Sequence, residues 1–114
     1  MASSDVRVAF DELRSIDSST LTGSYQVVGS TFSSPIIMLK IVNDANEDVT
    51  VSYDGSTDQD FVPANGFTLY DFNTNHYASS RGGGGAFQLA VGEGVYVKGT
   101  AGTGTIYVVA IAAG

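Results

Sequence analysis

A series of short apolar and alternating segments, separated by turns rich in glycine, proline and asparagine, restricts this chain to an all-β fold. Residues 36–42 form a continuous apolar run that only Lys40 interrupts. Val49, Val51 and Tyr53 then alternate with polar residues, as in a strand with one buried face. Further strands are predicted over 67–72, 87–91, 95–98 and 105–112. The number and spacing of these segments predict a β-sandwich or jelly roll of roughly seven to eight short antiparallel strands, with a small barrel as the alternative.

The residues between these segments predict which strands are neighbours. Because only a short polar loop separates 36–42 from 49–53, we expect these two strands to form a hairpin. The sequence Pro-Ala-Asn-Gly at 63–66 predicts a tight turn, since proline favours turns and Asn-Gly tolerates positive φ. Glycines within 92–94 and 99–104 predict two more hairpins between the later strands.

The first third of the chain has a weaker pattern. Residues 11–16 are compatible with one helical turn, and 25–28 with a first core strand. Alternating apolar residues between 6 and 10 have no obvious local partner. We therefore expect a single β-domain with an N-terminal arm within 1–20, whose first ten residues reach a neighbouring subunit or another surface of the assembly beneath it, with Phe10 as the apolar anchor.

Length and composition exclude several classes of protein. A chain of 114 residues has room for one domain. Its formal charge of −7 disfavours binding to nucleic acid or to an anionic membrane surface. It has no cysteine, so neither a disulfide framework nor a thiolate metal site is expected. The first ten residues, MASSDVRVAF, do not resemble a secretory signal, and no apolar stretch is long enough to span a membrane, so we expect synthesis in a cytoplasm.

The residues that could carry chemistry do not form a catalytic pattern. The single histidine, His76, has no neighbouring cysteine or nucleophile motif. Asp54, Asp58 and Asp60 could supply oxygen ligands for Ca²⁺, but their spacing does not match an EF-hand, and a plain polar turn is the preferred interpretation. We therefore predict no enzyme activity, no metal site and no cofactor.

One long loop stands apart from the strands. Residues 73–85 end in four consecutive glycines, which carry high conformational entropy. We expect this loop to be mobile in the free protein and to make contacts only in an assembly, through His76, Tyr77 and Arg81.

Apolar residues in excess of one small core are the strongest functional signal. Strand 36–42 is apolar on both faces, with Ile36, Met38 and Val42 predicted to share one of them. The stretch 86–114 has only Glu93 and Lys98 as charges. Such faces need a cover, which is either an arm of the same chain or another subunit. The predicted interface residues are Phe10, Ile36, Met38, Tyr107, Val109 and Ile111.

Four stretches of the sequence resemble a known family. They are ELRSIDSSTLTGSYQVVGSTF, PIIMLKIVNDANEDVTVSYDG, DFVPANGFTLYDFNTN and GVYVKGTAGTGTIYVVAIAAG. In strand and turn arrangement they are similar to small virion structural proteins of tailed bacteriophages. The resemblance implies a β-sandwich located in the virion, with viral capsid or tail proteins as partners. It favours a capsid decoration or cement protein, with a neck, tail or fibre-attachment component as the alternative. Because virus shells offer local three-fold sites, a homotrimer is the favoured form of self-association.

A carbohydrate-binding β-sandwich module is the alternative from another class. Such modules stack exposed aromatic side chains on sugar rings, and Tyr70, Tyr77, Tyr96 and Tyr107 are the candidates here. The chain has no tryptophan, which makes this interpretation weaker.

Overall fold

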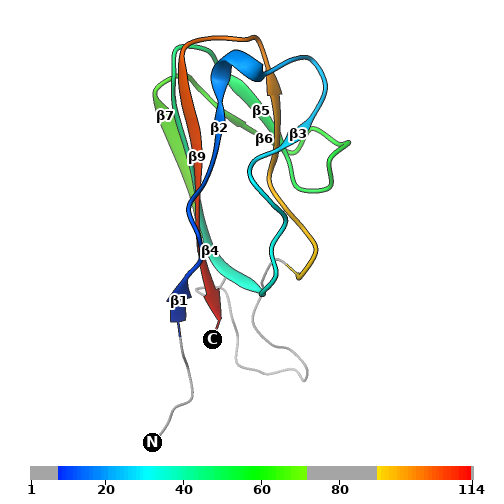
Figure 1. The fold of residues 1–114 in the computed structure, drawn as a ribbon, viewed down its shortest axis with the longest axis vertical. Helices are drawn as coiled ribbons and strands as arrows, with labels where there is room; N and C mark the ends of the chain where they lie inside the picture. Colours follow the sequence, from blue (N-terminus) through cyan, green and yellow to red (C-terminus); the bar gives the residue numbers. More distant parts are fainter. Residues whose placement is uncertain (1–7, 72–89, 114) are drawn as a thin grey trace, which may run out of the picture.

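Two antiparallel sheets lie face to face in the computed structural model, which describes residues 8–71 and 90–113 (Figure 1). The predicted β-sandwich is therefore confirmed, with nine strands in the described part of the chain. The five-stranded sheet, sheet A, consists of β1 (Val8–Phe10), β2 (Arg14–Asp17), β4 (Ile36–Ala45), β7 (Gly66–Asp71) and β9 (Gly104–Ala113). The four-stranded sheet, sheet B, consists of β3 (Gln26–Val27), β5 (Val49–Ser52), β6 (Asp60–Val62) and β8 (Tyr96–Gly99).

The centre of sheet A is formed by β4 and β9, the two longest strands. β4 pairs with β7 on one edge and with β9 on the other. The far edge of β9 pairs with β2 over one half of its length and with β1 over the other half. The strand order is therefore β1-β9-β4-β7, with β2 beside β1 on β9.

The start of the chain differs from the prediction. Strand β1 has a partner within its own chain, since Val8 pairs with Ala113, so the expectation that residues 1–10 lack a local partner is wrong for 8–10. Arg14–Asp17 is a strand rather than part of a helical turn, because β9 offers it a free edge. The only helical turn in the described residues is the 3₁₀ segment Ser18–Thr20, which the Asp17 side chain caps by accepting a hydrogen bond from the Ser19 N–H.

The hydrophobic core lies between the inner faces of the two sheets. Leu39 and Ile41 of β4 point inward beside their β9 partners Ala110 and Val108. Sheet B contributes mainly valines, whose branched side chains suit a pleated surface. The core comprises Leu21, Val28, Phe32, Ile36, Leu39, Ile41, Ala45, Val49, Val51, Val62, Val95, Val97, Ile106, Val108, Ala110 and Ala112.

A β-bulge in β4 changes the predicted face of one residue. The register with β9 shifts between Ile36 and Met38, so the strict alternation is broken at Ile37. Ile36 therefore points into the core with an exposed fraction of 0%, while Met38 points outward. The expectation that Ile36 shares the outer face with Met38 is wrong for this reason.

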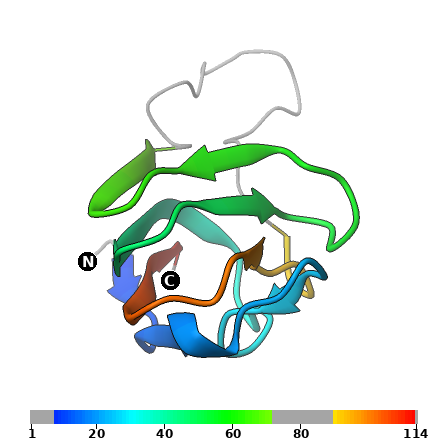
Figure 2. The same ribbon diagram turned by 90° about the horizontal axis from the view of Figure 1, so that it is seen from above.

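The hairpins predicted between 36–42 and 49–53 and across 99–104 are wrong, because these connections cross from one sheet to the other (Figure 2). The hairpin predicted across 92–94 involves a strand that lies mostly outside the described residues. Both edges of β4 are already paired, so β5 pairs in sheet B instead. Likewise β8 belongs to sheet B and β9 to sheet A. The tight turn at 63–66 is confirmed: the Gly66 N–H donates to the Pro63 carbonyl at 2.9 Å, and Asn65 has a φ of 59°.

Part of the chain lies outside the described residues. It includes the loop 73–85 and most of the predicted strand 87–91, of which Ala90 and Val91 are not in a strand. Among the described residues, no helix has the length and apolar character needed to cross a membrane.

Candidate docking face on the five-stranded sheet

The surface of sheet A that faces away from sheet B is covered by large apolar side chains, and we call it the outer face of sheet A. Of the six large hydrophobic side chains that are exposed in the described part of the chain, three lie on it: Phe10, Phe67 and Leu69, with exposed fractions of 78%, 66% and 53%. The face consists of Phe10, Ser15, Asp17, Met38, Lys40, Val42, Asp44, Phe67, Leu69, Asp71, Thr105, Tyr107, Val109 and Ile111.

Strand register arranges these side chains in rows across the sheet. In the row next to the β4 bulge, Ile111 of β9 lies between Phe10 of β1 and Met38 of β4. In the other two rows, Lys40 lies between Val109 and Leu69, and Val42 lies between Tyr107 and Phe67. These two rows follow from the pairing of β4 with β9 and β7. Contiguous apolar surface of this kind on a soluble protein marks an interaction site.

Two shallow hollows shape the outer face. One has a volume of about 230 Å³ and lies among Phe10, Met38, Leu69, Val109 and Ile111. The other has a volume of about 250 Å³ and lies among Val42, Asp44, Asn65 and Phe67. Lys40 lines both of them, so its side chain separates the two.

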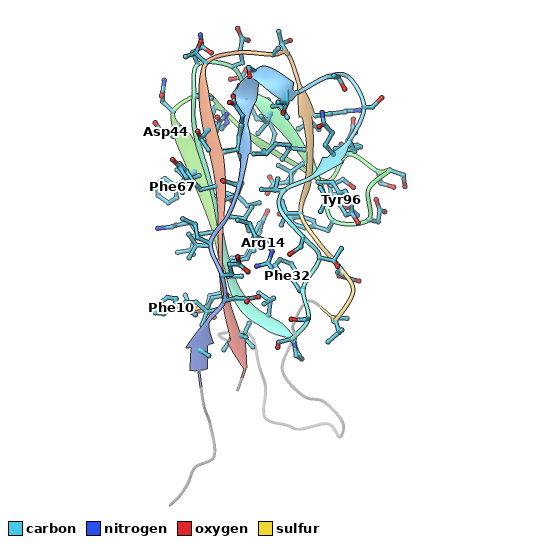
Figure 3. The ribbon with its side chains drawn as sticks, viewed as in Figure 1. Phe10, Arg14, Phe32, Asp44, Phe67 and Tyr96 are labelled. Carbon is cyan, nitrogen blue, oxygen red and sulfur yellow. The ribbon has the colours of Figure 1, made fainter. Side chains whose placement is uncertain are left out.

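The charged residues on this face are Asp17, Lys40, Asp44 and Asp71. Lys40 and Asp44 both point outward from β4, on either side of Val42. Within the described ranges 8–71 and 90–113, neither side chain makes an ion pair or a side-chain hydrogen bond. Figure 3 shows Asp44, Phe67 and Phe10 projecting on the same side of the ribbon, away from sheet B.

The structure brings five of the predicted interface residues together on this face: Phe10, Met38, Tyr107, Val109 and Ile111. The sixth, Ile36, belongs to the core. Sequence reasoning missed Phe67 and Leu69, although their alternation with Thr68 and Tyr70 was a signal for a common face. The predicted loop contacts His76, Tyr77 and Arg81 lie outside the described residues.

The opposite surface, on sheet B, is more polar and carries a small cluster of charged and aromatic groups. Lys98 Nζ lies 3.0 Å from Asp58 Oδ1 and 4.7 Å from the centre of the Tyr25 ring. The Tyr25 hydroxyl donates to Asp58 Oδ1. Burial, and then the hydrogen bond to the Asp58 carboxylate, raises the pKa of Tyr25 to about 12. The bonds from Tyr25 and Lys98 lower the pKa of Asp58.

The three aspartates of the 54–60 turn do not converge on one point. The Asp54 carboxylate accepts hydrogen bonds from the backbone N–H groups of Ser56 and Thr57, and these bonds lower its pKa. Asp58 is bound to the sheet B cluster, and Asp60 accepts bonds from two tyrosine hydroxyls. No group of three or more metal-ligating side chains occurs in the described part of the chain.

The tyrosines proposed for sugar stacking occupy different surroundings. The Tyr70 hydroxyl donates to Asp60, and its ring packs edge-on against Tyr53 with centroids 6.3 Å apart. The Tyr96 ring packs beside Gly55 on sheet B, whereas Tyr107 lies on the outer face of sheet A. They therefore form no common platform. Tyr77 lies outside the described residues.

One buried charge, which sequence reasoning missed, joins the edge of sheet A to the loop after β3. The Arg14 side chain points into the sandwich with its guanidinium 4.6 Å from the centre of the Phe32 ring (Figure 3). Its Nε donates to the Ser30 carbonyl at 2.8 Å, and one terminal nitrogen lies 3.2 Å from Asp11 Oδ2. The sequence feature that could have revealed this is the position of Arg14 two residues before the apolar Ile16, because residues two apart in a strand lie on the same face.

Comparisons with protein families, curated proteins and solved structures found no match to this chain.

Proposed function

We propose that this chain is a non-enzymatic structural subunit of a virus particle, specifically a capsid decoration or cement protein of a tailed bacteriophage. In this role it stabilises the shell through protein–protein contacts with the capsid and with its own copies. The observation that carries the proposal is the outer face of sheet A, together with the sequence resemblance described above.

The energetics of this face support a docking role. The exposed rings of Phe10 and Phe67 project from strands that pair with β9 and β4, and the inner faces of these two central strands form part of the core. Removing a phenylalanine side chain from water contributes about 1.5–3 kcal/mol. A rigid apolar patch loses little conformational entropy on binding, so most of this free energy is available for association.

Electron cryo-microscopy of the purified virus particles tests the proposal. We expect density for this chain on the shell, with the outer face of sheet A buried against another protein. Absence of the chain from the particles would refute a virion role, and density confined to the neck or tail would refute the decoration role.

Two matched variants test whether occupancy on the particles depends on the outer face of sheet A. Phe67→Asp places a charge in the proposed contact and should reduce the occupancy on particles by at least about tenfold. Phe61→Asp changes a comparably exposed phenylalanine, with an exposed fraction of 54%, on sheet B, and should leave the occupancy unchanged. Equal effects of the two substitutions would contradict a role of the outer face of sheet A in the assembly.

A further inference from the structure

We propose that the outer face of sheet A binds a second copy of this chain about a two-fold axis that passes over Val42. This inference rests on the docking face of the proposed function and names what occupies it. The axis lies in the plane of the contact and runs across the strands, so that β4 of one copy lies antiparallel over β4 of the other.

The positions of Lys40 and Asp44, the two charged residues of β4 on this face, select this arrangement. Lys40 and Asp44 point outward two positions before and two positions after Val42. At about 3.3 Å per residue, each lies about 6.6 Å from the axis. The rotation therefore places Lys40 of each copy opposite Asp44 of the other. Packed sheets lie about 10 Å apart, a gap that a lysine and an aspartate side chain span together.

The other two-fold arrangement is disfavoured. An axis parallel to β4 would leave each residue of this strand opposite itself, with Lys40 facing Lys40 and Asp44 facing Asp44. Both contacts repel, and neither places an ammonium group of β4 opposite a carboxylate of β4. Charge complementarity therefore distinguishes two arrangements that apolar burial alone would allow.

The shape of the face fits the same axis. The row of Tyr107, Val42 and Phe67 lies along the axis, so each ring meets its own counterpart in the other copy. Leu69 of each copy then falls over the 250 Å³ hollow whose wall includes Asn65. The contact is isologous, as a two-fold pair requires.

The area of overlap sets the strength of the pair. About seven residues of β4 overlap its counterpart, and four strands lie side by side, which corresponds to roughly 440 Å² per copy in projection. A total near 900 Å² is below the usual range for a stable complex and is typical of a weak one. We therefore expect a dissociation constant in the micromolar range. Inside a larger assembly, other contacts of the two copies would strengthen their pairing.

This arrangement differs from the trimer expected from the sequence. A sheet face that packs on itself closes with two copies, whereas a three-fold ring needs two different surfaces in contact. The trimer stays a prediction that no observation tests.

Charge exchange across the axis tests the proposal. Sedimentation equilibrium is measured for the wild type, for Lys40→Glu, for Asp44→Lys and for an equimolar mixture of the two variants. Each variant alone brings two pairs of like charges together and should weaken the pair at least about tenfold. In the mixture both contacts become attractive again, so the two variants should pair with each other at about the wild-type strength. Circular dichroism verifies that each variant is folded.

The Asp44→Lys variant also separates the proposal from overall repulsion. It changes the net charge from −7 to −5, because one acid becomes a base. Overall repulsion would therefore predict stronger association, whereas the proposed contact predicts weaker association. As a control, Lys98→Asp on sheet B should leave the association constant of the pair within about twofold of the wild type.

The proposal is overturned if the wild-type chain stays monomeric up to about 1 mM, which is far above the expected dissociation constant. It is also overturned if either single variant associates as strongly as the wild type, or if the mixture of the two variants fails to pair. A monomeric chain that still occupies the shell would overturn this inference and leave the proposed function intact.

Discussion

Replacing Arg14 with alanine should be among the most damaging single changes to the free energy of unfolding, because it removes a buried cation that several groups surround. The side chain is only 6% exposed, and its Asp11 partner is 23% exposed. It donates to the carbonyls of Ser30 and Glu12 at 2.8 and 3.1 Å. Two such charge-assisted bonds contribute about 3–6 kcal/mol, and the ring contact with Phe32 about 1 kcal/mol. Water that enters the space left by the truncated side chain forms hydrogen bonds with the exposed partners and restores part of this free energy. We therefore expect the free energy of unfolding to fall by about 3–5 kcal/mol.

The expected change in melting temperature follows from the size of the protein. An unfolding entropy of about 2.1 cal/mol/K per residue gives about 0.24 kcal/mol/K for this chain, so the loss corresponds to about 12–20 °C. Thermal and urea denaturation followed by circular dichroism measure both quantities. Lys98→Met is the control, because that ion pair is exposed and should contribute less than about 1 kcal/mol. If Arg14→Ala costs no more than the control, the buried network does not stabilise the fold as we infer.

Two further predictions concern a backbone position and a tyrosine. Gly29 and Gly92 both have positive φ, but a Cβ on Gly29 would lie 2.8 Å from Arg14 Cβ, whereas Gly92 has open space around it. Urea denaturation should therefore show Gly29→Ala to be more destabilising than Gly92→Ala by about 1–3 kcal/mol. Equal losses of stability in the two variants would contradict a tight contact at Gly29. The raised pKa of Tyr25, about 12, implies a stabilising contribution that is complete below pH 10 and lost as the pH rises through 12. Phenolate absorbance, with Tyr25→Phe as the reference, should show this pKa falling in part toward 10 in Asp58→Asn, and an unchanged pKa would exclude the carboxylate as a cause.

The class of fold could be predicted because hydrophobic alternation reports which residues face inward. Segments 36–42 and 105–112 correspond to β4 and β9, the centre of sheet A. Pairing could not be predicted in the same way. The short loop after β4 suits a hairpin as well as a crossing between sheets, and only the occupation of both edges of β4 by β7 and β9 decides the matter.

The candidate docking face could be predicted where apolar and polar residues alternate within a single strand, because this pattern depends only on neighbouring residues. It identified Met38, Tyr107, Val109 and Ile111 as members of an apolar face. It failed at Ile36 because a bulge inserts one residue and reverses the faces on one side of it. Arg14 was missed because a basic residue in a polar segment is usually exposed, and its partners lie 16 and 17 residues further along the chain.

The position of β9 has a consequence for how the protein acquires its structure during synthesis. Strands β1 and β2 are made early, yet both pair with β9, which is made after every other described strand. Sheet A therefore stays open on the ribosome until β9 emerges, whereas β5 and β6 of sheet B can pair much earlier. The pairs that β9 makes with β1 and β2 span nearly the whole chain, and contacts of such long sequence separation make folding slow. Until β9 is made, one edge of β4 has no partner, and an unpaired strand edge in a nascent chain favours aggregation.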